Sequence, residues 1–303
     1  MKNVRFTEDD ISIGVRIDKF LTDRLKAPSR SYVQNIIDKG LVIVNNKVVK
    51  SNYKLRDGDE IEVTIPAAEK LEVIPQEIPL DILYEDRDVI VINKPQGMVV
   101  HPAAGNRDNT LVNALLYHCE DLSGINGVIR PGIVHRIDKN TSGVLVAAKN
   151  DNAHNKLAEQ LKEHTMNREY IALVEGRLNN ESGTIDAPLG RNPQDRLKYA
   201  VVKNGKNAVT HYNVLQVFDR FTLVACKLET GRTHQIRVHM AYIGHPLVGD
   251  PLYGYKKQSF KLEGQLLHAR ILGFVHPSTG EYMEFEAPIP EYFQRIISKI
   301  KVS

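Results

Sequence analysis

Cysteines are scarce in this chain, and their scarcity excludes two kinds of small fold. The 303 residues include two cysteines, Cys119 and Cys226. Two thiols cannot build a disulfide framework or a zinc ribbon, and neither residue has a second cysteine at Cys-x-x-Cys spacing. We therefore expect both cysteines to be buried, inert thiols in a globular protein.

Long apolar runs are also missing. A membrane-spanning helix needs about 20 consecutive apolar residues, and the longest apolar stretches here are far shorter. Residues 1–10 are polar and end in acidic side chains, whereas a secretory signal has a basic start and an apolar core. The sequence thus predicts a protein that has no membrane partner and stays in the cytoplasm.

The charges of the whole chain nearly balance, but those of one segment do not. A formal net charge of +3 is weak support for a polyanionic partner. Between residues 16 and 56, however, ten Lys and Arg residues stand against three Asp residues, an excess of seven positive charges. Such a local excess can neutralise several phosphates, so this segment is the predicted nucleic-acid-binding part.

The same segment has the pattern of a small ααβ module. Apolar residues recur at helical spacing over residues 17–25 and 30–37. Turn residues then separate short β-prone runs, which predicts strands over 41–44, 47–49 and 60–65.

A linker and a larger second domain are predicted to follow. Prolines and charges interrupt the pattern over residues 67–79, so the module comprises residues 1–66 and the second domain residues 80–303. The β-prone runs of the second domain are 89–92, 144–148, 170–174, 209–217 and 221–228, and its helical stretches are 111–118, 152–164 and 234–243. Because strands outnumber helices without regular alternation, we predict an α+β fold with a mixed, mainly antiparallel sheet and flanking helices.

One nonapeptide, His135 to Gly143, places a carboxylate among basic and hydroxyl side chains just before an apolar run. An Asp followed by small polar residues ahead of a strand is often only a turn, in which Asp and Thr bind nearby backbone amides. The alternative is a catalytic loop built around Asp138.

This nonapeptide and three further motifs resemble the RluA-type pseudouridine synthases. It matches the family pattern His-Arg-Leu-Asp, two variable residues and Thr-Ser-Gly, and Ile137 is the one, conservative departure. Asn93 to Pro102 resembles the first family motif, Arg168 to Tyr170 the tyrosine motif, and Leu228 to His239 the third motif. The resemblance spans roughly the last three quarters of the chain and is closest to the D-type members, which act on large-subunit ribosomal RNA.

The resemblance implies that the second domain isomerises uridine to pseudouridine in RNA without a metal, nucleotide or redox cofactor. It assigns catalysis to Asp138, the cation paired with it to Arg237, and stacking on the uracil, with help in removing the C5 proton, to Tyr170. The target base must leave its stack, and we expect the planar guanidinium of Arg136 to fill the gap. The sequence leaves open whether Asp138 attacks the anomeric carbon or abstracts a sugar proton.

The N-terminal module resembles an S4 RNA-binding domain. The resemblance rests on Ser29-Arg30 before the second helix, Val44-Asn45 before a basic turn and Gly58-Asp59 before the last strand. We expect Arg30, Lys39 and Lys47 to bind RNA phosphates, although surface Lys and Arg often only solvate a face.

The expected partner is ribosomal RNA or the pre-ribosomal large subunit, with the helix 69 region as the target and a monomer as the acting form. Family members with the same motifs modify other ribosomal sites or transfer RNA, so these substrates stay open.

Three other functions are alternatives to an RNA pseudouridine synthase. A non-catalytic RNA-binding protein, such as a ribosome-assembly factor, would have no use for Asp138 in a basic pocket. A metal-dependent hydrolase is disfavoured because His234 and His239, five residues apart, lie about 140° apart around a helix. A serine hydrolase is disfavoured because Ser142 lacks a Gly-x-Ser-x-Gly elbow.

Overall fold

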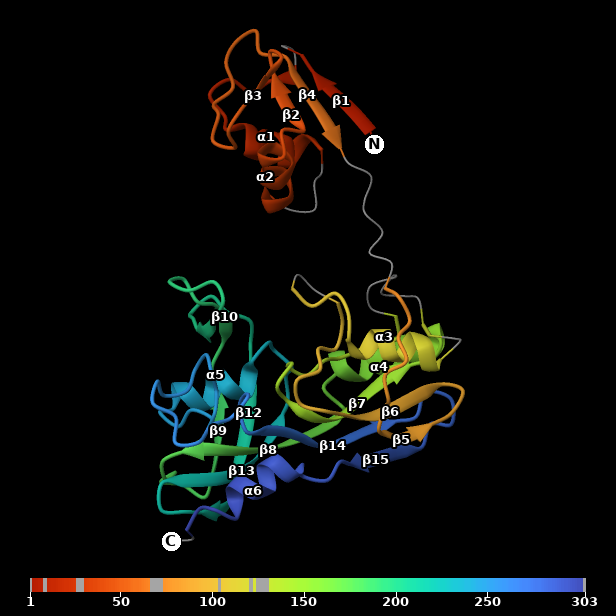
Figure 1. Ribbon diagram of the computed structural model, residues 1–303, viewed down its shortest axis with the longest axis vertical. Coiled ribbons are helices and arrows are strands. Elements are labelled where there is room, and N and C mark those ends of the chain that lie inside the picture. The colour runs from red at the N-terminus through yellow and green to blue at the C-terminus, as the bar shows by residue number, and fades with distance from the viewer. Residues whose placement is uncertain are drawn as a thin grey trace. The chain divides into compact units, whose positions relative to one another are not determined.

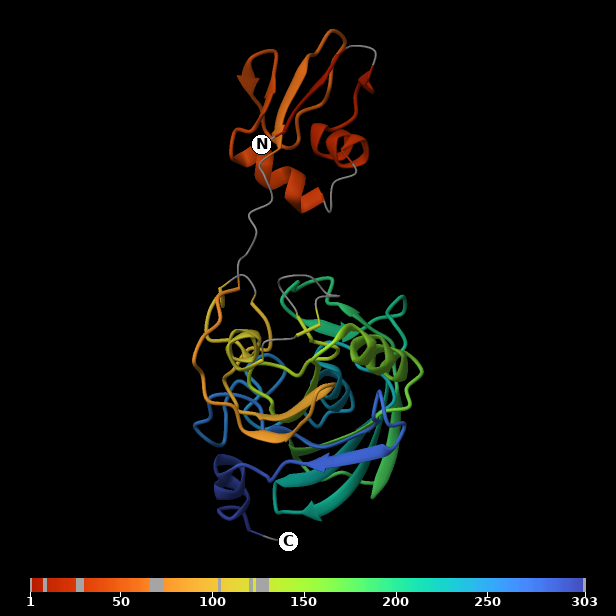
Figure 2. The ribbon, with the colours of Figure 1, turned by 90° about the vertical axis from the view of Figure 1, so that its right-hand side faces the viewer.

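The computed structural model of the protein describes residues 2–7, 10–25, 30–65, 73–102, 105–119, 122–123 and 131–301. The chain forms two compact units, residues 1–70 and 71–303, which we describe separately (Figure 1, Figure 2). Part of the predicted linker, residues 67–72, lies outside the described residues. After it, the Gln76 N–H donates to the Asn113 carbonyl at 2.9 Å, and Asn113 Nδ2 donates to the Ile74 carbonyl at 2.8 Å. The end of the predicted linker is therefore held by the second unit.

The N-terminal unit packs two helices against an antiparallel sheet. The helices are α1 (Ile17–Arg24) and α2 (Arg30–Asp38), and the sheet has the order β1-β4-β2-β3. Its strands are β1 (Lys2–Phe6), β2 (Val42–Val44), β3 (Lys47–Val48) and β4 (Ile61–Ile65). The predicted ααβ order is present, with β1 as an addition to it.

Strand β1 was not predicted because its apolar pattern is short. Phe6 is its buried residue, and the Phe6 ring meets the Phe20 ring of α1 edge-on at 5.4 Å between centroids. β1 also pairs with β4 over its whole length, from Lys2 opposite Ile65 to Phe6 opposite Ile61. The strand thus depends on a partner almost sixty residues away in sequence, which local propensity does not register.

Asp18 fastens the two helices of this unit to each other. Its buried carboxylate accepts hydrogen bonds from Arg16, Arg30 and Gln34, each with a contact at 2.9 Å. Burial alone would raise the pKa of Asp18, but these donors hold it well below its usual range. The Arg30 side chain, 49% exposed, therefore serves the packing of α1 on α2, whatever it contributes to binding.

The second unit is built on a nine-stranded sheet within the described part of the chain. Its main order is β5-β6-β7-β14-β8-β13-β12-β9, and β15 pairs with β14. The strands are β5 (Ile82–Glu85), β6 (Val89–Lys94), β7 (Ser142–Ala148), β8 (Asn167–Glu175), β9 (Ser182–Asp186), β12 (Val209–Val217), β13 (Phe221–Leu228), β14 (Leu267–Val275) and β15 (Tyr282–Glu286). Among the described strands of this sheet, β7 and β14 are the one parallel pair. The predicted α+β fold with a mixed, mainly antiparallel sheet is confirmed.

Helices cover both faces of this sheet. The side of Leu145 and Ala147 packs with α3 (Leu111–His118) and α5 (Gln235–Tyr242) in one core. The side of Val144 and Val146 packs with α4 (Asp151–Lys162), and farther along the sheet α6 (Glu291–Ile297) covers β8 and β13, so α5 and α6 lie on opposite sides of the sheet (Figure 1). Strand β7 is consequently buried at every residue, which explains its continuous apolar sequence.

Several elements of the second unit were not predicted. These are β5, β9, β14, β15, α6 and a small hairpin of β10 (Leu189–Arg191) and β11 (Tyr199–Val201). β9 reads Ser-Gly-Thr-Ile-Asp, and β14 carries His268 and Arg270 among its apolar residues. Their place in the sheet comes from pairing with β12 and β8 rather than from a local apolar pattern. No helix among the described residues is long and apolar enough to cross a membrane.

Candidate active site

Gly143 marks the point where the Asp138 loop leaves the sheet. It pairs with Ala269 where β7 and β14 run in parallel, and its φ is 114°. A Cβ at this position would collide with the Ala269 backbone. Only glycine satisfies both the dihedral angle and the close approach, so the last residue of the nonapeptide fixes the start of β7.

Lys94, at the end of β6, binds backbone carbonyls of the same loop and of its own segment. It is fully buried, and its Nζ donates to the carbonyls of Pro95 (2.8 Å), Met98 (2.8 Å) and Lys139 (3.2 Å). All three ammonium protons thus have acceptors. Burial lowers the pKa of Lys94 to about 7, although the nearby Asp138 acts to raise it. Lys94 joins the first motif to the residue that follows Asp138.

The other side of the loop is held by the segment before β14. Gln265 Nε2 donates to Thr141 Oγ1 at 3.1 Å, and Asn140 Nδ2 donates to the Glu263 carbonyl at 3.1 Å. Ser142 Oγ lies 2.9 Å from His268 Nδ1. Side chains from β6 and from the segment before β14, together with Asn140 of the loop itself, therefore hold the loop that carries Asp138.

Arg237, on α5, is a buried cation between two carboxylates. Its Nε and Nη2 donate to Asp250 at 2.7 and 2.9 Å, and its Nη1 donates to Asp138 Oδ2 at 2.9 Å. Asp250 is fully buried, whereas the Asp138 side chain is 25% exposed. Burial alone would lower the pKa of Arg237, but Asp250 and Asp138 raise it above its ordinary value. The guanidinium is therefore a permanent positive charge beside Asp138.

Asp250 owes its own orientation to the backbone that follows it. Its Oδ1 accepts the N–H groups of Leu252 at 2.9 Å and Tyr253 at 3.1 Å. The Tyr253 ring lies under Arg237, with the guanidinium carbon 5.1 Å from the ring centroid. Arg237 is thus fixed by a forked ion pair on one side and an aromatic face on the other.

His234 stands at the start of α5 with a left-handed backbone, φ 58°. Its Nδ1 lies 2.8 Å from the Tyr253 hydroxyl, and its Nε2 lies 3.9 Å from Asp138 Oδ2. Burial lowers the pKa of His234, although Asp138 acts to raise it. His239, in contrast, faces inward and uses both ring nitrogens on Thr210 and Ala187. The two histidines of this motif serve different parts of the structure.

Asp138 borders a cavity of about 480 Å³, a size common for binding sites of small organic groups. Tyr170 and Arg168 reach it from the same face of β8, and both side chains are more than nine-tenths buried. Burial raises the pKa of Tyr170, with a further increase from Asp138 opposed by Arg168. The cavity thus combines one carboxylate and one neutral phenol with four guanidinium groups, those of Arg136, Arg168, Arg232 and Arg237.

Arg168 has an unusual environment for a buried cation. Its Nη2 donates to the Glu229 carbonyl at 3.0 Å, while its Nε finds no hydrogen-bond partner among the described residues. A Cβ on Gly231 would lie 2.7 Å from its Nη1, so the glycine of the third motif makes room for the guanidinium. Burial lowers the pKa of Arg168.

The remaining predicted site residues lie apart from this cavity or at its edge. Arg136 is exposed at the rim, with its Nη2 3.4 Å from Thr233 Oγ1. Arg30, Lys39 and Lys47 belong to the N-terminal unit. Lys39 and Lys47 are exposed, and they occupy neighbouring segments, because Gly40 approaches Val48.

Four residues of the site had no role in the sequence interpretation. They are Asp250, Tyr253, Lys94 and Arg168. Lys94 and Arg168 stand inside recognised motifs, and that was the available signal. Asp250 and Tyr253 lie in the loop after α5, outside the motifs, and no sequence pattern connects them with Arg237.

Replacing Lys94 with methionine should loosen the Asp138 loop. Lys94→Met removes the donor shared by three loop carbonyls, which we expect to cost about 2–4 kcal/mol of stability. Hydrogen exchange of the peptide over residues 134–143 should become faster. Lys139→Met, which removes an exposed side chain of the same loop, is the control and should leave exchange unchanged. Equal protection in both variants would contradict the role assigned to Lys94.

Two family models match the chain. The model described as RNA pseudouridylate synthase matches residues 88–242, and the S4 domain model matches residues 15–61. Among curated proteins, an uncharacterized RNA pseudouridine synthase of Bacillus subtilis, YlyB, is 55% identical over 99% of both chains. The ribosomal large subunit pseudouridine synthase D of Zymomonas mobilis is 47% identical over 100% of this chain and 98% of its own.

Solved structures agree with these relatives. The human RNA pseudouridylate synthase domain containing 1 superposes with a TM-score of 0.61 at 27% identity, covering 79% of this chain and 92% of its own. Human RNA pseudouridylate synthase domain containing 4 gives a TM-score of 0.56 at 25% identity. The chain therefore belongs to the RNA pseudouridylate synthase family and is an RNA pseudouridine synthase with an N-terminal S4 domain.

Proposed function

We propose that this enzyme modifies uridines of large-subunit ribosomal RNA, in the helix 69 region, and that Asp138 carries out the chemistry. The ion pair of Asp138 with buried Arg237 is the observation that supports the catalytic role. If the nonapeptide were only a turn, the Asp138 carboxylate would bind backbone amides. Within the described part of the chain, its one hydrogen-bond donor is Arg237.

The reaction sets the demands on this carboxylate. The N1–C1′ bond of uridine breaks, the uracil turns, a C5–C1′ bond forms, and the proton on C5 leaves. Asp138 either attacks C1′ or removes a sugar proton, and both routes need an oriented, unprotonated oxygen. Arg237 and His234 both lie next to Oδ2, at 2.9 and 3.9 Å, so we assign the reacting position to Oδ1.

Tyr170 is our candidate for holding the detached uracil. Its ring lines the cavity beside Asp138 and offers an aromatic face to the base. Because burial raises its pKa, the phenol stays protonated near neutral pH and is a poor base. We therefore assign its hydroxyl a part in C5 deprotonation only as a relay that gives one proton while it accepts another.

Arg168 is our candidate for binding the uracil carbonyls. Its buried Nε has no partner among the described residues, and the side chain lines the same cavity as Tyr170. An unsatisfied buried donor costs about 1–3 kcal/mol, so a carbonyl acceptor from the substrate would offset this cost. Arg168 would then hold the base during its rotation without touching the sugar.

Arg136 and the N-terminal unit are assigned to RNA binding. Arg136 is exposed at the rim of the cavity, where a planar guanidinium can take the place of the flipped base in the stack. Lys39 and Lys47 are exposed in neighbouring segments of the S4 domain and suit contact with phosphates. Arg30 contributes less charge than its exposure suggests, because it is paired with Asp18.

The choice of RNA rests on relatives. Proteins of Zymomonas mobilis, Xanthomonas campestris and Neisseria meningitidis named ribosomal large subunit pseudouridine synthase D are 44–47% identical to this chain. Each aligns over 95% or more of this chain, S4 domain included. We therefore favour ribosomal RNA over transfer RNA as the substrate.

Mapping of pseudouridines in cells tests target and catalyst together. In cells that lack this protein, carbodiimide treatment and primer extension should show missing signals in the helix 69 region. Wild-type protein should restore them, and Asp138→Ala should not, since we expect it to lower turnover on the order of 10⁴-fold or more.

Purified Asp138→Ala should still bind the RNA hairpin, which separates catalysis from binding. Restoration by Asp138→Ala would contradict the catalytic assignment. Unchanged ribosomal signals together with lost transfer RNA signals would contradict the substrate assignment and leave the catalytic one standing.

The phosphate-binding role of the S4 domain predicts a change in salt dependence. Lys39→Gln and Lys47→Gln together should lower the slope of log affinity against log salt by about 2, while turnover at saturating RNA is kept. Lys299→Gln removes an exposed charge from the C-terminal end of the second unit and should leave the slope unchanged. The same slope for all three proteins would refute the phosphate contacts.

A further inference from the structure

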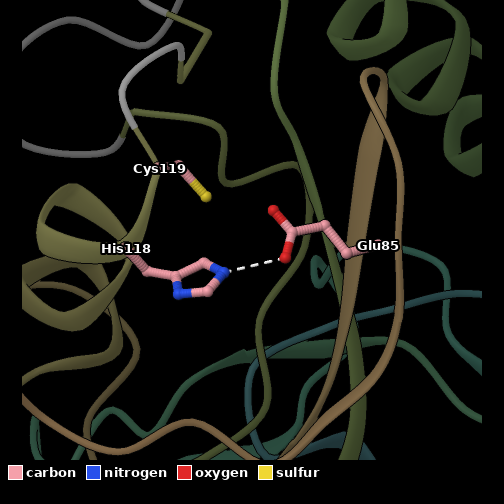
Figure 3. A group of neighbouring side chains, drawn as sticks. All are labelled: Glu85, His118 and Cys119. Atoms are coloured by element: carbon pink, nitrogen blue, oxygen red, sulfur yellow. Dashed lines mark hydrogen bonds and ion pairs between the residues drawn. The ribbon is translucent and has the colours of Figure 1, made fainter.

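Three side chains with metal-binding atoms converge away from the active site, at the end of α3. Glu85 ends β5, His118 is the last residue of α3, and Cys119 follows it. Figure 3 shows the His118 ring and the Cys119 sulfur both directed toward the Glu85 carboxylate. One ligand atom from each residue lies within 4.8 Å of the other two. None of these residues has a part in the proposed chemistry.

The three side chains differ in burial and in the contacts that hold them. Cys119 is buried, whereas the His118 side chain is 39% exposed. His118 Nε2 lies 2.8 Å from Glu85 Oε2, and Lys149 Nζ lies 2.7 Å from Glu85 Oε1. The sulfur is thus buried and Glu85 Oε1 is held by Lys149, while the imidazole on Oε2 is at the surface, where the ring can move.

A second group of potential ligands is Asp86, Asp88 and His276, but its histidine is already fully used in hydrogen bonds. His276 Nε2 contacts Asp86 at 2.8 Å, and its Nδ1 accepts the N–H groups of Ser278 and Thr279 at 3.3 and 3.1 Å. Both ring nitrogens are therefore used in closing a turn, and no lone pair remains for an ion. That group is a structural network and carries no site.

We propose that Glu85, His118 and Cys119 form a binding site for a borderline-soft divalent metal ion, with Zn²⁺ as the preferred ion. Thiolate, imidazole and carboxylate are the three ligand types that zinc uses in proteins, at about 2.0–2.3 Å. The His118 nitrogen and the Glu85 oxygen, 2.8 Å apart, must separate slightly to admit the ion, and the exposed His118 ring can supply this movement. A water molecule would complete the tetrahedron from the exposed side of the site.

Binding is balanced in protons. The ion displaces the proton of the Cys119 thiol, which leaves to solvent. At His118 the ion takes the Nε2 lone pair, so the ring hydrogen that faces Glu85 Oε2 moves to Nδ1 and the imidazole neither gains nor loses a proton. Lys149 keeps its bond to Glu85 Oε1 and orients the ligating carboxylate, as outer hydrogen-bond partners do in metal sites.

The ion would join the end of α3 to β5. Helix α3 packs in the same core as the inner side of β7, and it holds the residues before β5 through Asn113 and Gln76. A bond between its last turn and Glu85 would therefore stabilise the second unit.

Titration of the full-length protein with Co²⁺ tests the site, because a thiolate ligand gives a charge-transfer band in the near ultraviolet. The chain has two cysteines, and Cys226 is buried in β13, away from any such cluster among the described residues. Cys226→Ser is therefore the matched control. We expect the band at one equivalent in wild type and Cys226→Ser, its loss in Cys119→Ser, and its displacement by Zn²⁺.

His118→Gln tests the site without disturbing the fold, since this side chain is partly exposed. A loss of metal binding in this variant is therefore not explained by unfolding. It should weaken Co²⁺ affinity by at least about tenfold, and Zn²⁺ should raise the melting temperature of wild type and Cys226→Ser but not of His118→Gln. A band that persists in Cys119→Ser, or no band in wild type, would overturn the proposal. So would an affinity unaffected by His118→Gln.

Discussion

The geometry of the active site depends on the buried guanidinium of Arg237. Burying a cation costs much less free energy when the cation is paired, and Asp250 provides a complete fork from the interior. The remaining Nη1 is then the donor that reaches Asp138. Asp138 is consequently not positioned by its own loop alone. Its carboxylate is bound to a charge that Asp250 and Tyr253 hold in place.

The active-site geometry also depends on the loop that carries Asp138. Holding its position requires contacts from separate sequence motifs. Lys94 from the first motif binds the backbone after Asp138, and Gly143 permits the close pairing of β7 with β14. In the third motif, Gly231 admits Arg168 to the cavity. The motifs are far apart in the sequence, but each contacts either the Asp138 loop or the cavity beside it.

Local patterns predicted most of the fold, and the exceptions have a common cause. Helices α3, α4 and α5 and strands β12 and β13 agree with their predicted ranges to within two residues at each end, since each has a long apolar pattern. Strands β1, β9 and β14 are defined by their partners. Charge counting likewise included Arg30 without showing that it is paired, because its partner Asp18 lies on the neighbouring helix.

The site was less accessible to sequence reasoning than the fold. Residues alone indicated a loop at Asp138 and could not exclude a turn, and the resemblance to a family supplied Tyr170 and Arg237. Asp138 and Arg237 are 99 positions apart, and no periodicity connects them. Asp250 was missed because its role depends on the fold that places it opposite Arg237, 13 residues away across the end of α5.

A double-mutant cycle on Arg237 and Asp250, read out as the single-turnover rate on saturating RNA, tests this account most directly. If Asp250 acts only by positioning Arg237, then Arg237→Lys and Asp250→Asn should each slow the chemical step strongly, and the double variant should be no slower than Arg237→Lys. RNA affinity should stay near that of wild type in all three variants. Strictly additive losses, or an unaffected rate in Asp250→Asn, would contradict the dependence of Asp138 on a guanidinium fixed from the interior.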